Sequence, residues 1–125
     1  MVKSIVIKGV SQKGLGLGIK LGFPTVNLDY DGELTGVFAG KILLADLEYI
    51  AAVHLGNRPT IGDSRSVCEV FLLDFNGIVE EGTDIEVTLL EKIRDVQKFS
   101  NLEELKAQIP RDVEFIKNCY TLRKK

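Results

Sequence analysis

Histidine and cysteine are scarce in this sequence, and their scarcity excludes several kinds of catalytic site. His54 is the only histidine, which leaves almost no material for a zinc site or a Ser-His-Asp triad. The two cysteines, Cys68 and Cys119, lie far apart and form no CxxC pair. Such cysteines are typical of reduced, buried thiols, so we expect a cytoplasmic protein without disulfides.

The chain also lacks an excess of charge and a long apolar run. Its formal net charge is −2, so no general attraction to nucleic acid is expected. The only early apolar run, MVKSIVIKGV, contains lysines, and no stretch is long enough to span a bilayer. With 125 residues, 45% of them hydrophobic, we expect a single domain over residues 1–125 with neither a nucleic-acid nor a membrane partner.

Apolar segments that alternate or run continuously indicate β-strands along most of the chain. No helical pattern separates one segment from the next, so a parallel βαβ sheet is not expected. Asp46 marks a hairpin turn between two of the segments. The predicted strands cover residues 4–10, 36–45, 47–55, 66–75 and 83–93.

Only the C-terminal segment has a helical pattern. Ser100 and Glu103 have the spacing of a capping box, and Pro110 is expected to break or kink the helix. Together with the strands, this segment predicts an all-β-dominated fold, a closed antiparallel barrel that carries one C-terminal helix. The apolar stripe consists of Leu102, Leu105, Ile109, Val113, Ile116 and Tyr120.

Alternating glycines at Gly14, Gly16 and Gly18 raise the question of a phosphate-binding loop. A dinucleotide-binding fingerprint requires a helix directly after the glycines, which Pro24 prevents. A P-loop requires a glycine before the lysine and a hydroxyl residue after it, and Lys20 has neither. Two interpretations remain: a loop whose backbone N–H groups and Lys20 bind phosphate, or a flexible loop without a ligand.

The segment Phe23-Pro24-Thr25-Val26-Asn27 offers two neutral oxygen donors. In an extended chain Thr25 and Asn27 point to one side, and Val26 points to the other. Mg²⁺ takes one or two such protein ligands and completes its shell with water and nucleotide phosphates. The alternative is that both side chains make local turn hydrogen bonds.

Glu69 interrupts an otherwise apolar row in the strand predicted at residues 66–75. Burial in such a row raises the pKa of a carboxyl group toward neutrality, which suits a general base. The alternative is an edge position where Glu69 reaches water or pairs with Arg65.

Arg94, Lys98 and Phe99 follow the last predicted strand closely. Two cations and an aromatic ring suit a nucleotide, although charges in a loop are more often simply solvated. His54, between Val53 and Leu55, is interpreted as a strand-surface residue rather than a ligand.

Taken together, six motifs resemble the riboflavin kinase (flavokinase) family, which also forms the C-terminal domain of bifunctional riboflavin kinase/FAD synthetases. The resemblance covers almost the whole chain, and LGFPTxN is its most specific motif. The six motifs are GLGLGIKLGFPTVN, GVFAG, GNRPTIG, CEVFLLDF, IRDVQKF and LEELKAQIPRD, in that order.

The resemblance implies a six-stranded antiparallel Greek-key barrel with a C-terminal helix. It implies transfer of the ATP γ-phosphate to the 5′-hydroxyl of riboflavin, which yields FMN. By this resemblance Thr25 and Asn27 bind Mg²⁺, and Glu69 is the catalytic base. The positions that match nucleotide contacts are Gly14, Gly16, Lys20, Thr25, Arg94, Gln97 and Phe99. Those that match flavin contacts are Leu72, Asp74 and Glu104.

The sequence departs from the family pattern at three positions. Leu17 replaces the arginine of the glycine loop, Leu15 replaces its polar neighbour, and Glu81 stands where the family favours tyrosine. No adenylyltransferase segment is present in these residues, so we expect FMN rather than FAD as product, from a monomer or from one domain of a bifunctional protein. The alternative function is a flavin- or nucleotide-binding barrel without catalysis, although such a barrel has no need of the base Glu69.

Overall fold

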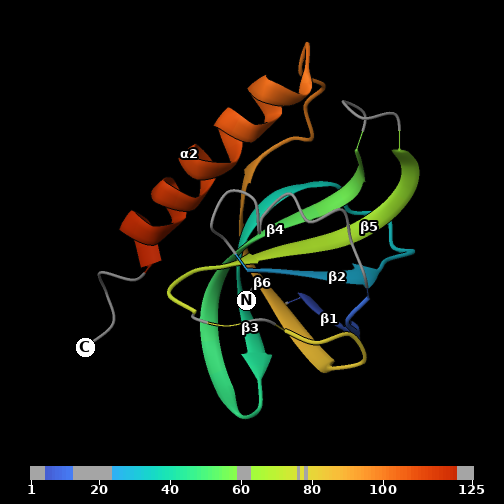
Figure 1. The fold of residues 1–125 in the computed structure, drawn as a ribbon, viewed down its shortest axis with the longest axis vertical. Coiled ribbons are helices and arrows are strands. Elements are labelled where there is room, and N and C mark those ends of the chain that lie inside the picture. The colour runs from blue at the N-terminus through green and yellow to red at the C-terminus, as the bar shows by residue number, and fades with distance from the viewer. Residues whose placement is uncertain (1–4, 13–23, 59–62, 76, 78, 121–125) are drawn as a thin grey trace.

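The computed structural model describes residues 5–12, 24–58, 63–75, 77 and 79–120 (Figure 1). Three residues of the expected phosphate loop, Gly14, Gly16 and Lys20, lie outside the described residues, as do Leu15 and Leu17. The elements are β1 (Ile5–Val10), β2 (Thr25–Asp29), β3 (Gly36–Leu44), β4 (Leu47–Arg58), β5 (Asp63–Leu72), β6 (Asp84–Arg94) and α2 (Leu102–Tyr120).

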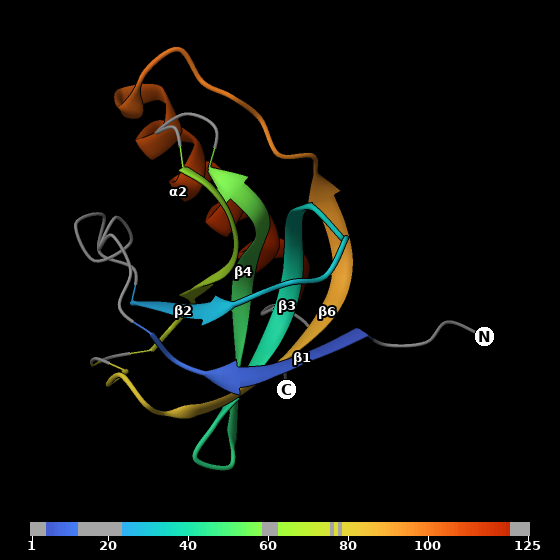
Figure 2. The same cartoon turned by 90° about the vertical axis from the view of Figure 1, so that its right-hand side faces the viewer.

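The strands form one six-stranded sheet in the order β1-β6-β3-β4-β5-β2. Every neighbouring pair is antiparallel, as expected from the absence of helices between the strands. The hairpin at Asp46 is confirmed: Ala45 and Asp46 both have positive φ, at 47° and 69°, as a tight two-residue turn requires. The sheet curves strongly, so that β1 and β2 cross in front of β3 and β4 in Figure 2, with α2 behind.

The expected closed barrel is instead open between β1 and β2, the two edges of the sheet. Within the described residues these edges share an isolated bridge, in which the Gln12 N–H donates to the Asn27 carbonyl at 2.7 Å. The β1–β6 ladder ends at Val10, and β2 is five residues long. The two edges therefore overlap too little to form a continuous ladder.

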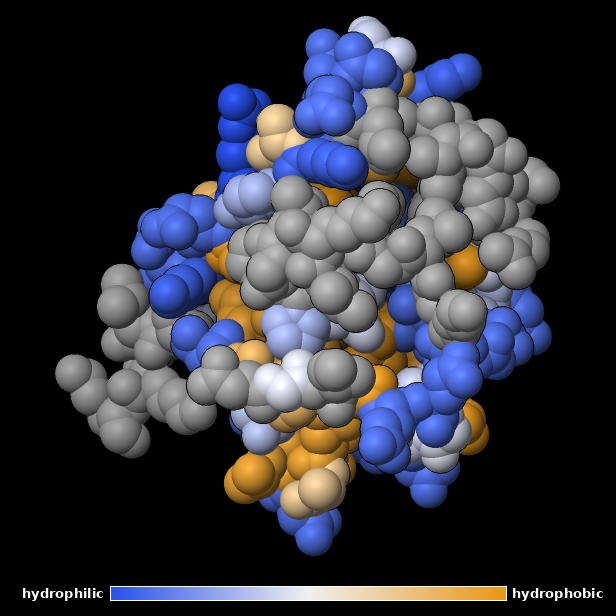
Figure 3. Space-filling model, viewed as in Figure 1, coloured by the Kyte–Doolittle hydropathy of each residue, from blue (hydrophilic) through white to orange (hydrophobic). Residues whose placement is uncertain are grey.

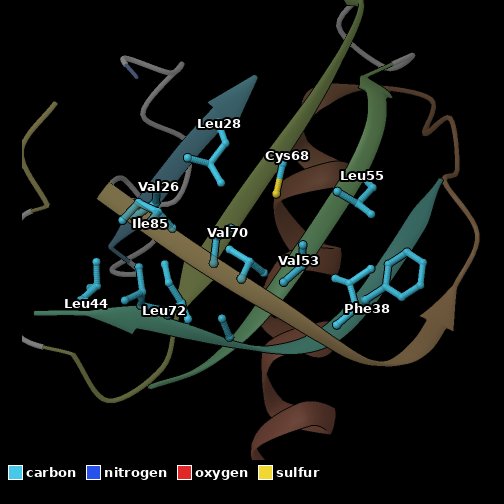
Figure 4. Packing of buried hydrophobic residues seen from close by; sticks show 14 residues of the cluster. Val26, Leu28, Phe38, Leu44, Val53, Leu55, Cys68, Val70, Leu72 and Ile85 are labelled. Carbon is cyan, nitrogen blue, oxygen red and sulfur yellow. The ribbon is translucent and has the colours of Figure 1, made fainter. Parts of the chain in front are cut away.

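Side chains on the two faces of the sheet form two separate hydrophobic clusters. We call the face that lines the barrel interior the inner face, and the face on which α2 packs the outer face. Figure 4 shows side chains from five strands converging on the interior. The inner cluster includes Val26, Leu28, Phe38, Ile42, Val53, Leu55, Cys68, Val70, Leu72 and Val87. The outer cluster consists of Ala39, Ala52, Phe71, Leu73, Ile109, Val113 and Ile116.

Helix α2 begins one residue later than the expected capping box implies. The side chain of Asn101 accepts a hydrogen bond from the Glu104 N–H at 2.9 Å, and the Glu104 carboxylate accepts one from the Ser100 N–H at 3.0 Å. Asn101 is therefore the N-cap in place of Ser100, and Glu104, in place of Glu103, bonds back to the Ser100 N–H. Asparagine is at least as good an N-cap as serine.

Of the two outcomes expected at Pro110, a break does not occur, because α2 continues to Tyr120. The residues on both sides of Pro110 hold the helix on the sheet: Ile109 and Val113 are each 6% exposed. Farther along, the Tyr120 hydroxyl donates to the Glu91 carboxylate of β6. Packing of the apolar stripe therefore compensates for the backbone hydrogen bond that proline removes.

Hydrophilic and hydrophobic residues gather at different places on the face of the molecule shown in Figure 3. Figure 3 shows hydrophilic residues along α2 and hydrophobic ones gathered near the β3–β4 hairpin. Leu47 of this hairpin is 60% exposed. No helix in the described part of the chain is long and apolar enough to cross a membrane.

Candidate active site

The strand register brings the expected metal ligand and the expected base together. Asn27 of β2 lies directly opposite Glu69 of β5, and Glu69 lies opposite His54 of β4. Directly opposite residues in antiparallel strands project from the same face with their Cβ atoms about 5 Å apart. Two segments that are remote in sequence therefore contribute to a single polar row.

This row lies on the outer face of the sheet. Val26 and Leu28 are each 2% exposed and belong to the inner cluster. Strand alternation therefore directs Thr25 and Asn27 to the outer face, as the sequence predicts. Thr25 lies opposite Phe71, so its hydroxyl group is one step along the same face from Asn27 and Glu69.

Glu69 is 4% exposed and is paired on both sides, by β2 and by β4. It is therefore a central position, which removes the alternative of an edge residue that reaches water. Its neighbours across the two ladders, Asn27 and His54, are both polar, so the carboxyl group is buried beside side chains that can form hydrogen bonds.

His54 is the site residue that sequence reasoning missed. It is half-buried, and its Nε2 lies 2.9 Å from the Asn57 carbonyl oxygen, near the end of β4. Only the β4–β5 register places it beside Glu69. A single strand pattern contains no signal for that neighbour, because register depends on both strands.

Cys68, the residue before Glu69, faces the inner cluster and is 0% exposed. Burial, together with the smaller effect of the nearby Glu69 charge, raises the pKa of its thiol to about 12. A thiol with this pKa stays protonated at neutral pH. Cys68 is therefore a core residue and not a nucleophile.

Arg94, expected at the nucleotide, is bound by Asp112 of α2. Its Nη2 donates to Asp112 Oδ2 at 2.9 Å, and its Nε donates to both carboxylate oxygens at 3.1 and 3.3 Å. The Phe99 ring lies 5.8 Å from the guanidinium carbon. Gln97 is exposed in the same connecting segment.

The three expected flavin contacts lie in different environments. Leu72 is 1% exposed in the inner cluster, as Figure 4 shows. Asp74 follows β5 with a φ of 55°, and its Oδ1 is 4.0 Å from Lys117 Nζ. One carboxylate oxygen of Glu104 is engaged in the cap of α2. The structure thus does not gather these three side chains around one point.

The donor chemistry of Thr25 and Asn27 fits Mg²⁺ bound together with a nucleotide. A hydroxyl and an amide carbonyl are hard oxygen ligands, and two of them leave most of an octahedral shell to water and phosphate. No group of three or more His, Cys, Asp or Glu side chains in the described residues is placed to hold a metal ion. A metal at Thr25 and Asn27 would therefore depend on its nucleotide.

The fold and this row define a small antiparallel β-barrel domain with a polar site on the face that carries its C-terminal helix. The chain belongs to the riboflavin kinase (Flavokinase) family, whose model matches residues 1–120. The resemblance to this family, which the six sequence motifs suggested, is thereby confirmed.

Curated relatives match most of the chain. It is 34% identical over 120 residues to the RNA-binding riboflavin kinase RibR of Bacillus subtilis, covering 94% of this chain and 52% of the relative. It is 39% identical over 110 residues to the bifunctional riboflavin kinase/FMN adenylyltransferase of Escherichia coli K12, covering 85% and 35%. The chain therefore spans between about half and a third of the length of these relatives.

Solved structures share the fold. A macrolide-efflux protein from Streptococcus pneumoniae superimposes with a TM-score of 0.74 and 28% identity, over 90% of this chain and 38% of that one. Riboflavin kinase from Trypanosoma brucei superimposes with a TM-score of 0.61 and 21% identity, over 98% of this chain and 82% of that one. At 21% identity the second likeness establishes the fold alone.

Proposed function

We propose that this chain is a riboflavin kinase, which transfers the γ-phosphate of ATP to the 5′-hydroxyl of riboflavin. The observation that carries the proposal is the register of β2 and β5, which sets Asn27 directly opposite the buried Glu69. A domain that only binds flavin has no use for a buried carboxylate beside two hard oxygen ligands. Family membership supplies the substrates for which this arrangement is suited.

Glu69 is the general base in this proposal. Its carboxylate accepts the proton of the riboflavin 5′-hydroxyl, and the hydroxyl oxygen forms a bond to the γ-phosphorus. The bond from that phosphorus to the bridging oxygen breaks, and ADP leaves. Phosphoryl transfer needs chiefly alignment and charge neutralisation, so one positioned base is sufficient for the proton.

Thr25 and Asn27 hold Mg²⁺ together with the nucleotide. When bound, the metal ion supplies charge neutralisation at the phosphate oxygens. Thr25 also contacts the nucleotide, and the further nucleotide contacts are Gly14, Gly16, Lys20, Arg94, Gln97 and Phe99. At least three of the five N–H groups of Arg94 are engaged within the protein, which leaves at most two for a phosphate.

Asp74 and Glu104 contact the flavin in this proposal, each with the carboxylate oxygen that has no described role in holding the fold. Leu72 contributes through its backbone, because its side chain is buried in the inner cluster. Residues 1–125 form one domain, which in a longer protein would act as the kinase part.

The direct test is formation of FMN by the purified chain. Riboflavin, Mg²⁺ and ATP, GTP or CTP are supplied separately, and FMN is resolved from riboflavin by chromatography. We expect ATP-dependent FMN formation that is abolished by EDTA and restored by excess Mg²⁺. Tight flavin binding with no FMN from any nucleotide would contradict the kinase and favour the non-catalytic flavin-binding barrel.

A further inference from the structure

Asp112 of α2 is among the few buried charged residues in the described part of the chain, and the proposed reaction does not use it. Its side chain is 8% exposed and that of Arg94 is 21% exposed. The Arg94 guanidinium donates to both carboxylate oxygens, and Gln108 Nε2 donates to Asp112 Oδ1 at 3.0 Å. A buried carboxylate is stable only when it is paired and hydrogen-bonded in this way.

This ion pair fixes one end of the segment that connects β6 to α2, residues 95–101. Arg94 is the last residue of β6, and its Nη1 donates to the Asp95 carbonyl at 3.1 Å. At the other end, the Asn101/Glu104 cap holds Ser100. Between them, the Phe99 ring lies 5.8 Å from the guanidinium carbon, within the range of a cation–π contact.

The pair lies away from Asn27 and Glu69. The paired residues Asn27, Glu69, His54, Val37 and Arg94 form one row across β2, β5, β4, β3 and β6. Four strand spacings of about 4.8 Å separate Arg94 from Asn27, or about 19 Å along the curved sheet. Asp112 therefore acts on the nucleotide through Arg94 and the connecting segment, and not by contact with Asn27 or Glu69.

We propose that Asp112 is a positioning residue: through Arg94 it holds residues 95–101, with Phe99 and Gln97, in the conformation that binds the nucleotide. This inference rests on the proposed kinase function for the identity of the ligand. Asp112 holds this segment through Arg94 whether or not a ligand is bound. The pair thus preorganises residues 95–101, so the conformational entropy of this segment is lost on folding and not on nucleotide binding.

The test compares Asp112→Asn with Glu114→Gln, which removes the same charge from an exposed position of α2. Hydrogen exchange of amides 95–101 is measured without ligand, and the Kd of ADP with Mg²⁺ is measured by calorimetry. In Asp112→Asn we expect faster exchange in this segment and a Kd raised about tenfold, with kcat at saturating ATP within about twofold. Glu114→Gln should match the wild type in each measurement.

Gln108→Ala provides a milder variant in case Asp112→Asn does not fold, because it removes one hydrogen bond to Asp112 and leaves the ion pair. It should shift exchange and Kd in the same direction by a smaller amount. Unchanged exchange in residues 95–101 of both variants overturns the positioning role, as does a lowered Tm with an unchanged Kd. If exchange is faster in Asp112→Asn but the wild-type protein forms no FMN, the positioning role is supported and the kinase function is rejected.

Discussion

Cys68 and Glu69 are adjacent on β5 and show how strand alternation separates two chemistries. The thiol faces the inner cluster, and the carboxylate faces the outer side of the sheet, beside Asn27. The sequence predicted that Thr25 and Asn27 share a side, because alternation is local. It could not predict that Glu69 is central rather than at an edge, because that depends on strands β2 and β4 packing on both sides.

The buried thiol of Cys68 predicts a loss of stability at alkaline pH. In the unfolded chain a thiol ionises near pKa 8.5, whereas burial raises the pKa of Cys68 to about 12 in the folded protein. The neutral thiol of Cys68 therefore stabilises the folded protein fully below pH 8.5. This stabilisation is lost as the pH rises toward 12, by at most about 1.4 kcal/mol per pH unit.

Urea unfolding at several pH values between 8 and 11 measures this slope in the wild type and in Cys68→Ala. The alanine variant should be less stable at pH 8 but should lose less stability per pH unit. Cys119 is present in both proteins and serves as an internal control. Parallel slopes would mean that Cys68 ionises in the folded protein as easily as in the unfolded one.

At the level of elements, the sequence predicted the position of α2 and its buried face, but not its N-cap residue or its continuation past Pro110. Periodicity identified Ile109, Val113 and Ile116, which all pack on the sheet. The cap register was wrong, and the break expected as one outcome at Pro110 does not occur, because contacts with the sheet hold the helix there. Local propensity gave no weight to the contacts that hold the helix on either side of the proline.

The cap assignment predicts unequal effects of two alanine substitutions. Asn101→Ala removes the side chain that accepts the Glu104 N–H, and should lower the free energy of unfolding by about 1 kcal/mol. Ser100→Ala keeps its backbone N–H donor to Glu104, and should change stability by less than about 0.5 kcal/mol. Urea denaturation measures both, and the reverse order would restore Ser100 as the cap.

At the level of the whole molecule, six antiparallel strands and a C-terminal helix were predictable, but closure was not. Motifs and apolar runs located five strands, and the resemblance to the flavokinase family supplied the sixth. Whether β1 and β2 complete a barrel depends on how far their ends overlap, and among the residues that the structure describes only Gln12 and Asn27 pair there. Sequence patterns carry no information on such an overlap, nor on the register that sets His54 beside Glu69.

Close contact of three central strands predicts that replacing Gly40 of β3 destabilises the fold. A Cβ atom there would lie 2.9 Å from Val53 Cγ2 and 3.0 Å from the Thr88 carbonyl oxygen of β6. Gly40→Ala should lower the free energy of unfolding by about 1–3 kcal/mol, since backbone must move. Gly9→Ala is the control, because its Cβ would meet Leu28 at 3.6 Å, an ordinary contact. Equal stability of the two variants would refute the close approach.

The role of Glu69 is the central claim, and turnover by Glu69→Gln tests it most directly. FMN formation and Tm are measured on the same preparation, with riboflavin affinity followed by flavin fluorescence. A general base predicts that kcat falls by roughly 10²–10⁴-fold while riboflavin affinity and the folded state are kept, because glutamine preserves the shape but accepts no proton. A variant that melts earlier yet retains the wild-type kcat would contradict the account, because Glu69 would then be a structural residue.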